Sequence, residues 1–81
     1  MWTAYPLQEV SPMADGCIAL IDRLIEERRR QGMTQRELAE AANLTQPVIA
    51  RFESKRAMPQ LDTLLKITDA LGCAIEIVRT E

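Results

Sequence analysis

The segment from residue 34 to residue 52 constrains the fold most, because it predicts two short helices separated by a tight turn. Its first residue is a threonine, and Glu37 follows three positions later, which is the capping-box pattern of a helix start. Asn43 tolerates the left-handed backbone conformation that a tight turn requires. Thr45 can then cap the next helix, and Pro47 falls in its first turn, where the missing N–H removes no hydrogen bond.

Helical periodicity on both sides of this segment predicts two further helices. Ser11-Pro12 is a favourable start, with serine as N-cap and proline at the first helical position, and the helix should stop at Gly32. Another periodic run follows the loop 54–59 and ends at Gly72. The residues expected on the inward faces are Ile18, Ile21, Leu24, Ile25 and Arg28, then Gln35, Leu38, Ala39 and Ala42, then Val48, Ile49 and Phe52, then Leu61, Leu64, Leu65, Thr68 and Leu71.

The two ends of the chain differ from its helical middle. Residues 1–10 show no helical period and contain a proline, so we expect an extended arm there, and residues 11–72 form the helical domain. Residues 73–81 carry partly alternating β-branched side chains and predict a short strand. The expected fold is therefore all-α, a compact domain of four or five helices with one C-terminal strand.

A lone strand is unstable in water, so the predicted strand needs a partner. Unless the arm supplies it, the simplest partner is the same segment of a second copy, related by a two-fold axis. We expect an antiparallel ribbon in which Ile75 and Ile77 face the helices and Glu76 faces water. The expected dimerisation residues are Ala74, Ile75, Ile77 and Val78.

Charge is distributed unevenly along the chain. The net charge is −2, but residues 23–56 carry eight Lys or Arg and five Glu, a local excess of +3. Residues 1–22 carry −3 and residues 57–81 carry −2. A basic middle between acidic ends favours a local patch for nucleic acid that the total charge hides.

Several classes of function are disfavoured by what the chain lacks. Cys17 and Cys73 are too few for a structural zinc site, there is no histidine, and we interpret both thiols as reduced. No Ser or Thr has a His or Lys base at catalytic spacing, so we expect neither an enzyme nor a cofactor. No apolar run approaches the ~18 residues that span a bilayer, and no signal peptide is visible, which predicts a cytoplasmic protein without a membrane partner.

The helix that starts after Thr45 has an unusual outward face, made of Gln46, Pro47, Ala50 and Arg51. Glutamine can pair with adenine and arginine with guanine, while proline and alanine can contact thymine methyl groups. The alternative to DNA contact is that these side chains form an ordinary solvent-exposed helix face. Two short helices joined by a tight turn form a helix-turn-helix, and this context favours DNA contact.

The sequence GMTQRELAEAANLTQPVIARFES, followed by MPQLDTLLKITDALG, resembles the phage-repressor type of helix-turn-helix, the XRE/Cro group, over residues 20–72. The added C-terminal strand makes the chain similar to antitoxins of the HigA and HipB kind, which repress their own operons as dimers. The resemblance implies a bacterial, nucleoid-associated repressor of a palindromic operator in double-stranded DNA, with a toxin as a second partner.

The resemblance also implies residue roles. The base-reading positions would be occupied by Gln46, Pro47 and Arg51. Backbone phosphates would be contacted by Gln35, Thr45, Lys55 and Arg56, although Lys55 stands where glycine is common. Arg28 and Glu53 match an ion pair that links the first helix to the third.

Two further functions remain open beside DNA-binding repression by an antitoxin. One is an interaction module whose main role is to bind and neutralise a toxin, and the other is a regulator of the same type that has no toxin. Four apolar residues of the arm, Trp2, Tyr5, Leu7 and Val10, favour an interaction role, because exposed apolar side chains mark binding surfaces. The alternative is that they pack on the chain's own first helix.

Overall fold

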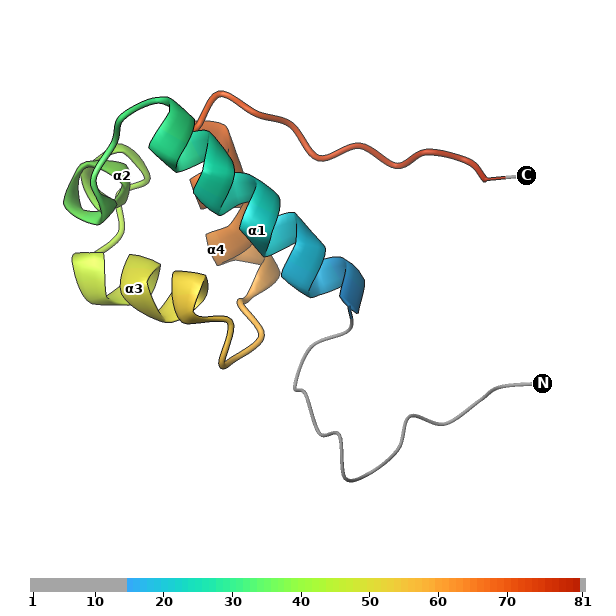
Figure 1. Ribbon diagram of the computed structural model, residues 1–81, viewed down its shortest axis with the longest axis horizontal. Helices are drawn as coiled ribbons and strands as arrows, with labels where there is room; N and C mark the ends of the chain where they lie inside the picture. The colour runs from blue at the N-terminus through green and yellow to red at the C-terminus, as the bar shows by residue number, and fades with distance from the viewer. Residues whose placement is uncertain (1–14, 81) are drawn as a thin grey trace.

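A computed structural model describes residues 15–80, which form four α-helices around one core (Figure 1). The helices are α1 (Asp15–Arg30), α2 (Gln35–Ala41), α3 (Gln46–Ser54) and α4 (Leu61–Ala70). Within these residues there is no strand and no fifth helix, so the all-α expectation with four helices is confirmed. The expected arm and the Ser11-Pro12 helix start lie outside the described residues.

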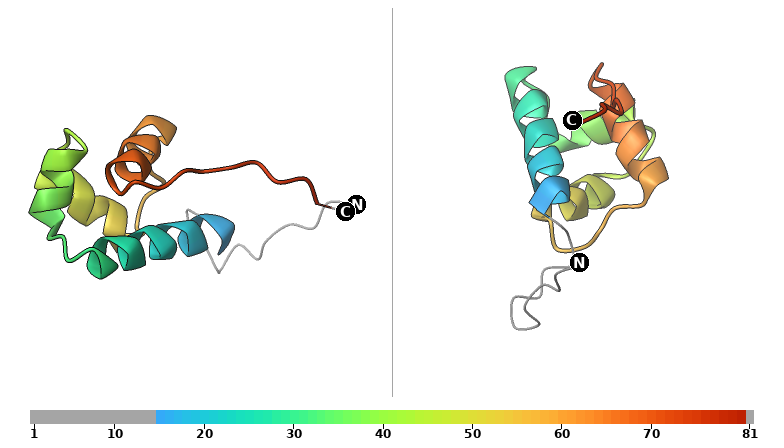
Figure 2. Two further views of the ribbon diagram at one scale, coloured as in Figure 1. Left: turned by 90° about the horizontal axis from the view of Figure 1, so that it is seen from above. Right: turned by 90° about the vertical axis from the view of Figure 1, so that its right-hand side faces the viewer.

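The helices are arranged so that α3 lies at the surface and is contacted by both α1 and α2. α2 contacts both α3 and α4, and α1 contacts α3. The right-angle views show α1 and α4 on opposite sides of the domain, with α2 and α3 at one end (Figure 2). None of the helices in the described range has the length and apolar character needed to cross a bilayer.

The predicted start of α2 is confirmed in atomic detail. The Thr34 hydroxyl accepts a hydrogen bond from the Glu37 backbone N–H at 3.0 Å. The Glu37 carboxylate in turn accepts from the Thr34 backbone N–H at 2.8 Å, which completes the capping box. Just before it, α1 stops as expected, because Gly32 adopts a φ of 73° that glycine tolerates without strain.

The turn between α2 and α3 also follows the sequence signals, with one exception. Asn43 has a φ of 57°, and the next backbone N–H, that of Leu44, donates to the Ala39 carbonyl at 2.8 Å. Pro47 lies in the first turn of α3. Thr45 occupies the N-cap position, but its side chain makes no capping hydrogen bond, so its hydroxyl is available to another partner.

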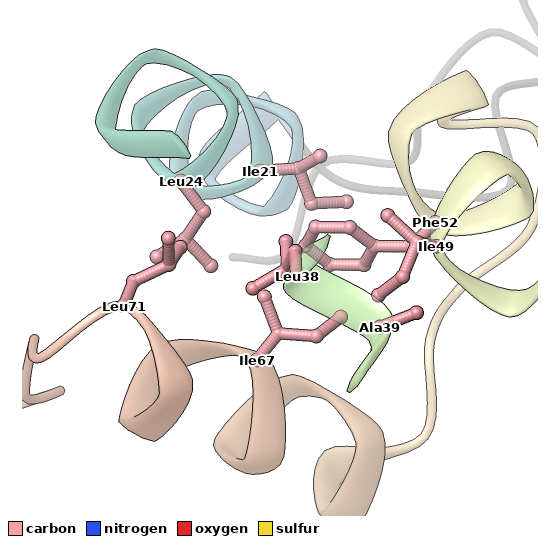
Figure 3. Packing of buried hydrophobic residues seen from close by; sticks show 8 residues of the cluster. All are labelled: Ile21, Leu24, Leu38, Ala39, Ile49, Phe52, Ile67 and Leu71. Carbon is pink, nitrogen blue, oxygen red and sulfur yellow. The ribbon is translucent and has the colours of Figure 1, made fainter. Parts of the chain in front are cut away.

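The core is a single aliphatic cluster with one aromatic ring, to which all four helices contribute (Figure 3). Ile49 and Ile67 are fully buried, and the Phe52 ring packs between the helices. Burying one such side chain contributes roughly 1.5–3 kcal/mol. The cluster comprises Ile21, Leu24, Leu38, Ala39, Ile49, Phe52, Ile67 and Leu71.

Three residues expected to face inward do not. Val48 is 36% exposed, Leu65 47% and Leu61 69%, whereas Ile67, absent from the expected set, is fully buried. α4 carries apolar side chains on more than half its circumference, so its periodicity fits two adjacent faces. The contact with α2 selects the face containing Ile67 and Thr68, and Leu61 and Leu65 remain outside it.

The C-terminal segment 73–80 has no regular secondary structure in the single chain and projects away from the helices (Figure 1). Ile77 is fully exposed and Val78 is 73% exposed, so Ile77 does not face the helices within one chain. A strand requires backbone partners along its length. Within residues 15–80 of one copy, the Cys73 N–H donates to the Thr68 carbonyl at 3.0 Å, but no strand lies beside the segment. Cys17 and Cys73 are both free thiols and half-buried.

Candidate nucleic-acid interface

Helix α3 is anchored from beneath and presents its other side outward. Ile49 and Phe52 fix its inner face, while Pro47 and Arg51 are exposed on the outer one. Val48 is exposed beside them and, together with Arg51, lines a shallow hollow that continues along the loop to α4. The outward face is therefore wider than the sequence predicted. Helical period alone could not show this, because an isolated valine in an apolar-rich helix suggests the core.

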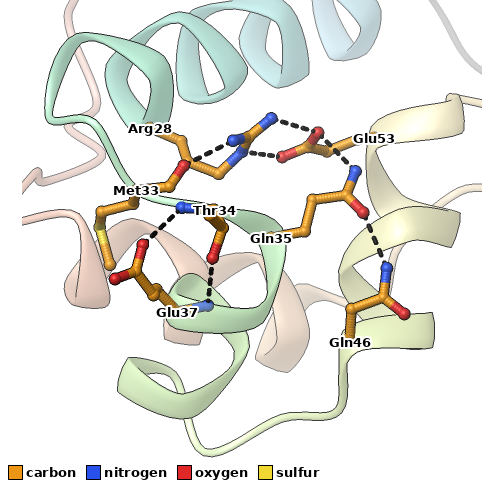
Figure 4. A network of polar contacts seen from close by, with 7 residues as sticks. All are labelled: Arg28, Met33, Thr34, Gln35, Glu37, Gln46 and Glu53. Atoms are coloured by element: carbon orange, nitrogen blue, oxygen red, sulfur yellow. Dashed lines mark hydrogen bonds and ion pairs between the residues drawn. The ribbon is translucent and has the colours of Figure 1, made fainter.

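A chain of polar side chains connects this surface to the interior (Figure 4). Arg28 of α1 donates from Nε to Glu53 Oε2 at 2.6 Å and from Nη2 to Oε1 at 3.0 Å. Gln35 of α2 donates to Glu53 Oε1 at 3.0 Å, and Gln46 of α3 donates to Gln35 Oε1 at 2.8 Å. Arg28 also donates to the Met33 carbonyl at 2.7 Å. We call Arg28, Glu53, Gln35 and Gln46 the polar chain.

The inner end of the polar chain is shielded from water. The side chains of Arg28 and Glu53 are only 11% and 8% exposed, and their contact is bidentate. Charge-assisted, bidentate pairs of this kind are among the stronger hydrogen bonds in proteins. In residues 15–80 no buried side-chain polar atom lacks a hydrogen-bond partner. The pair therefore connects α1 to α3, the second helix of the helix-turn-helix.

The outer end of the polar chain orients the Gln46 amide. A glutamine amide has two N–H donors and one carbonyl acceptor, and Gln35 takes up one of those donors. The remaining donor and the carbonyl are the two groups with which glutamine recognises adenine. Gln35 and Gln46 were singled out separately from the sequence, but their mutual contact depends on the packing of α2 against α3.

Three of the four expected phosphate-binding residues lie at the ends of α3, and the fourth, Gln35, is the first residue of α2. Thr45 is exposed at the N-terminal end, with its hydroxyl unused as a cap. Arg56 is exposed beyond the C-terminal end. Lys55 adopts a φ of 59°, the conformation that explains why glycine would suit this position, and its ammonium group pairs with Asp22 of α1. To contact a phosphate, the Lys55 ammonium group would therefore have to leave Asp22.

A second, exposed ion pair joins Arg30 to Glu27 on α1. The hydrogen bond from Arg30 lowers the pKa of the Glu27 carboxyl, with smaller contributions from Gln31 and nearby charge. This pair lies in solvent, so it provides a natural reference for the buried pair between Arg28 and Glu53. No cluster of metal-ligating side chains occurs among the residues that the structure covers.

Comparisons with known proteins agree with this geometry. A family model described as Helix-turn-helix matches residues 24–78. An uncharacterized HTH-type transcriptional regulator of Haemophilus influenzae is 43% identical over 61 residues, which is 75% of this chain and 62% of that protein. The HTH-type transcriptional regulator PuuR of Escherichia coli is 35% identical over 63 residues, 78% of this chain but 34% of its own length.

A solved structure, a Toxin-Antitoxin module from Streptococcus pneumoniae, is also similar, with a TM-score of 0.69 and 42% identity. The match covers 83% of this chain and 74% of that chain. In contrast, the chain spans less than two thirds of the length of either transcriptional regulator.

Proposed function

Because this chain belongs to the XRE-type helix-turn-helix family of transcriptional regulators, we propose that it is a sequence-specific repressor that binds double-stranded DNA and has no enzymatic activity. The observation that carries the proposal is the outward face of α3, where the Gln46 amide is held in place by Gln35. Gln46, Pro47 and Arg51 would contact base edges in the major groove. The repressor would act in the bacterial cytoplasm, at the nucleoid.

We further propose that the chain is the antitoxin of a type II toxin–antitoxin pair and represses its own operon. Its similarity to the Toxin-Antitoxin module from Streptococcus pneumoniae supports this role. The second candidate is a regulator of the same type without a toxin, which the similarity to PuuR favours. Co-expression with the product of the adjacent gene distinguishes them, because only an antitoxin restores growth when that product is toxic.

DNA binding would involve a dimer on a palindromic operator. Two-fold symmetry would place two copies of α3 in successive major grooves, about 34 Å apart. We propose that Ala74, Ile75, Ile77 and Val78 form the contact between copies, as an antiparallel ribbon. The exposure of Ile77 and Val78 in the single chain supports this, since it leaves these side chains without cover. A gel shift on DNA from upstream of the gene tests operator binding directly.

The Arg51→Ala variant should weaken binding to the operator by ~1–3 kcal/mol and relax the preference at one base pair. Arg51 is exposed on α3 and outside the polar chain, so the substitution should leave stability nearly unchanged. Fluorescence anisotropy with operator variants measures both effects, and Lys66→Ala on α4 is the matched control for lost positive charge. An unchanged base preference would contradict the base-reading role of Arg51.

The Lys55→Ala and Arg56→Ala variants should weaken binding to all DNA sequences alike. Each removes one cation at the end of α3, so the slope of log K against log salt should fall by about one per lost phosphate contact. Titrations at several salt concentrations, with operator and random duplexes, provide the measurement. Because Lys55 is paired with Asp22, we expect the smaller effect for Lys55. A change in base preference would exclude a phosphate-only role.

A further inference from the structure

Asp22 of α1 forms an ion pair with Lys55, one of the residues that we expect to contact the DNA backbone. The two residues are 33 positions apart in the sequence, and the Lys55 ammonium group lies 2.5 Å from Asp22 Oδ1. Lys55 caps the C-terminal end of α3. The pair therefore brings a carboxylate of α1 to the edge of the proposed DNA-binding surface.

The backbone at Lys55 has a conformation that is uncommon for a lysine. Its φ of 59° and ψ of 24° lie in the left-handed region, which residues with a Cβ rarely occupy. Glycine would adopt this conformation without strain, but it could not carry a cation. A lysine here therefore has a local cost in stability. What it adds is an ammonium group at the end of α3, within reach of Asp22.

Solvent reaches both members of this ion pair. The Lys55 side chain is 33% exposed and the Asp22 side chain 51%, in contrast to the shielded pair of Arg28 with Glu53. Pairs that are open to water contribute little to stability, so this one is not needed to hold α1 and α3 together. Carboxylate and phosphate oxygens both accept charge-assisted hydrogen bonds from lysine. A phosphate of bound DNA can therefore take the place of the Asp22 carboxylate.

We propose that Asp22 competes with the DNA backbone for Lys55 and thereby lowers the affinity of the protein for DNA of every sequence. This inference rests on the proposed function, in which Lys55 contacts a phosphate. When the ammonium group moves to the DNA, Asp22 loses its partner and remains as a negative charge beside the phosphates. Both changes oppose binding. Because phosphate contacts carry no sequence information, specific and random DNA are weakened by the same factor.

The Asp22→Asn variant of the full chain tests this competition, because it removes the charge and keeps the size of the side chain. We expect it to bind DNA about two- to five-fold more tightly per bound chain, the range that corresponds to an exposed ion pair. Fluorescence anisotropy at one salt concentration, with DNA from upstream of the gene and with a random duplex, should give the same gain for both. Circular dichroism should show unchanged helicity, since Asp22 is exposed.

Loss of any acidic group strengthens DNA binding through long-range charge, so controls must separate the ion pair from net charge. Glu26→Gln removes one negative charge from the same helix, and Glu26 is exposed and belongs to none of the ion pairs within residues 15–80. In the Lys55→Ala background, the gain from Asp22→Asn should fall to that of Glu26→Gln. In the Arg56→Ala background the full gain should remain, because the partner of Asp22 is Lys55.

The inference is overturned if Asp22→Asn gains no more affinity than Glu26→Gln, or if its gain is as large without Lys55 as with it. Weaker binding by Asp22→Asn would also overturn it, because Asp22 would then position Lys55 for the phosphate. These results leave the proposed function intact as long as the wild type prefers the upstream duplex to the random one. If the wild type binds neither duplex at low salt, the proposed function fails and this inference fails with it.

Discussion

Replacing Arg28 by alanine is expected to lower the free energy of unfolding by ~3–5 kcal/mol, the usual cost of leaving one member of a buried ion pair without its partner. The Glu53 side chain is only 8% exposed in the wild type, and in the variant its carboxylate would keep only the Gln35 amide as a donor. The Met33 carbonyl would also lose the donor that it receives from Arg28. For 81 residues the total stability is about 4–12 kcal/mol at 0.05–0.15 kcal/mol per residue, so this loss is a large part of it.

Arg30→Ala is the matched control, because it removes the same charge from the same helix. The ion pair of Arg30 with Glu27 is exposed to solvent, and exposed pairs contribute little to stability. Guanidinium unfolding of both variants gives the comparison. A second variant, Arg28→Met with Glu53→Leu, should recover much of the loss, because no charge is then buried alone. Equal melting temperatures for Arg28→Ala and Arg30→Ala would contradict the structural role of the buried pair.

Deleting residues 73–81 is expected to yield a monomer and to abolish tight operator binding at the same time. If two copies bind two half-sites as one unit, separating them loses the roughly 10²–10⁴-fold gain that linkage provides. Light scattering measures the assembly state and a gel shift measures binding. A truncated chain that remained dimeric would exclude the ribbon as the interface, and α4 would become the better candidate.

A point substitution tests the proposed contact between copies separately from the stability of the fold. The deletion also removes the Cys73 backbone N–H, which donates to the Thr68 carbonyl at the end of α4 at 3.0 Å. Ile77→Lys avoids this, because Ile77 is fully exposed in the single chain and contributes nothing to its core. It should dissociate the dimer without changing helicity. Arg79→Ala, two residues further along the same segment, is the control and should leave the dimer intact.

Local chemistry allowed the sequence to predict the helix starts and turns. The capping box of Thr34 and Glu37 depends on four consecutive residues, and the positive φ of Asn43 depends on that residue and its turn. Such signals need no knowledge of the tertiary fold. They were sufficient to place the helix-turn-helix, although the outward face of α3 also includes Val48, which the sequence placed inside.

The side of each helix that is buried was harder to predict, because it depends on neighbours that are distant in sequence. Leu61 and Leu65 fit the helical period as well as Ile67 does, and only the position of α2 decides which side of α4 is buried. For the same reason the sequence suggested roles for Gln35 and Gln46 individually, whereas their hydrogen bond required the folded arrangement of α2 and α3.

The polar chain makes the proposed DNA-facing positions unequal as targets for engineering. Arg51 stands apart from it, so if Arg51 contacts a base as proposed, that residue could be exchanged for another to change the DNA sequence bound while the scaffold stays as it is. Gln46 is tied through Gln35 to the carboxylate that holds α1 and α3 together. Any replacement at that position must therefore offer Gln35 a new donor, or the altered specificity will come with a less well-ordered protein.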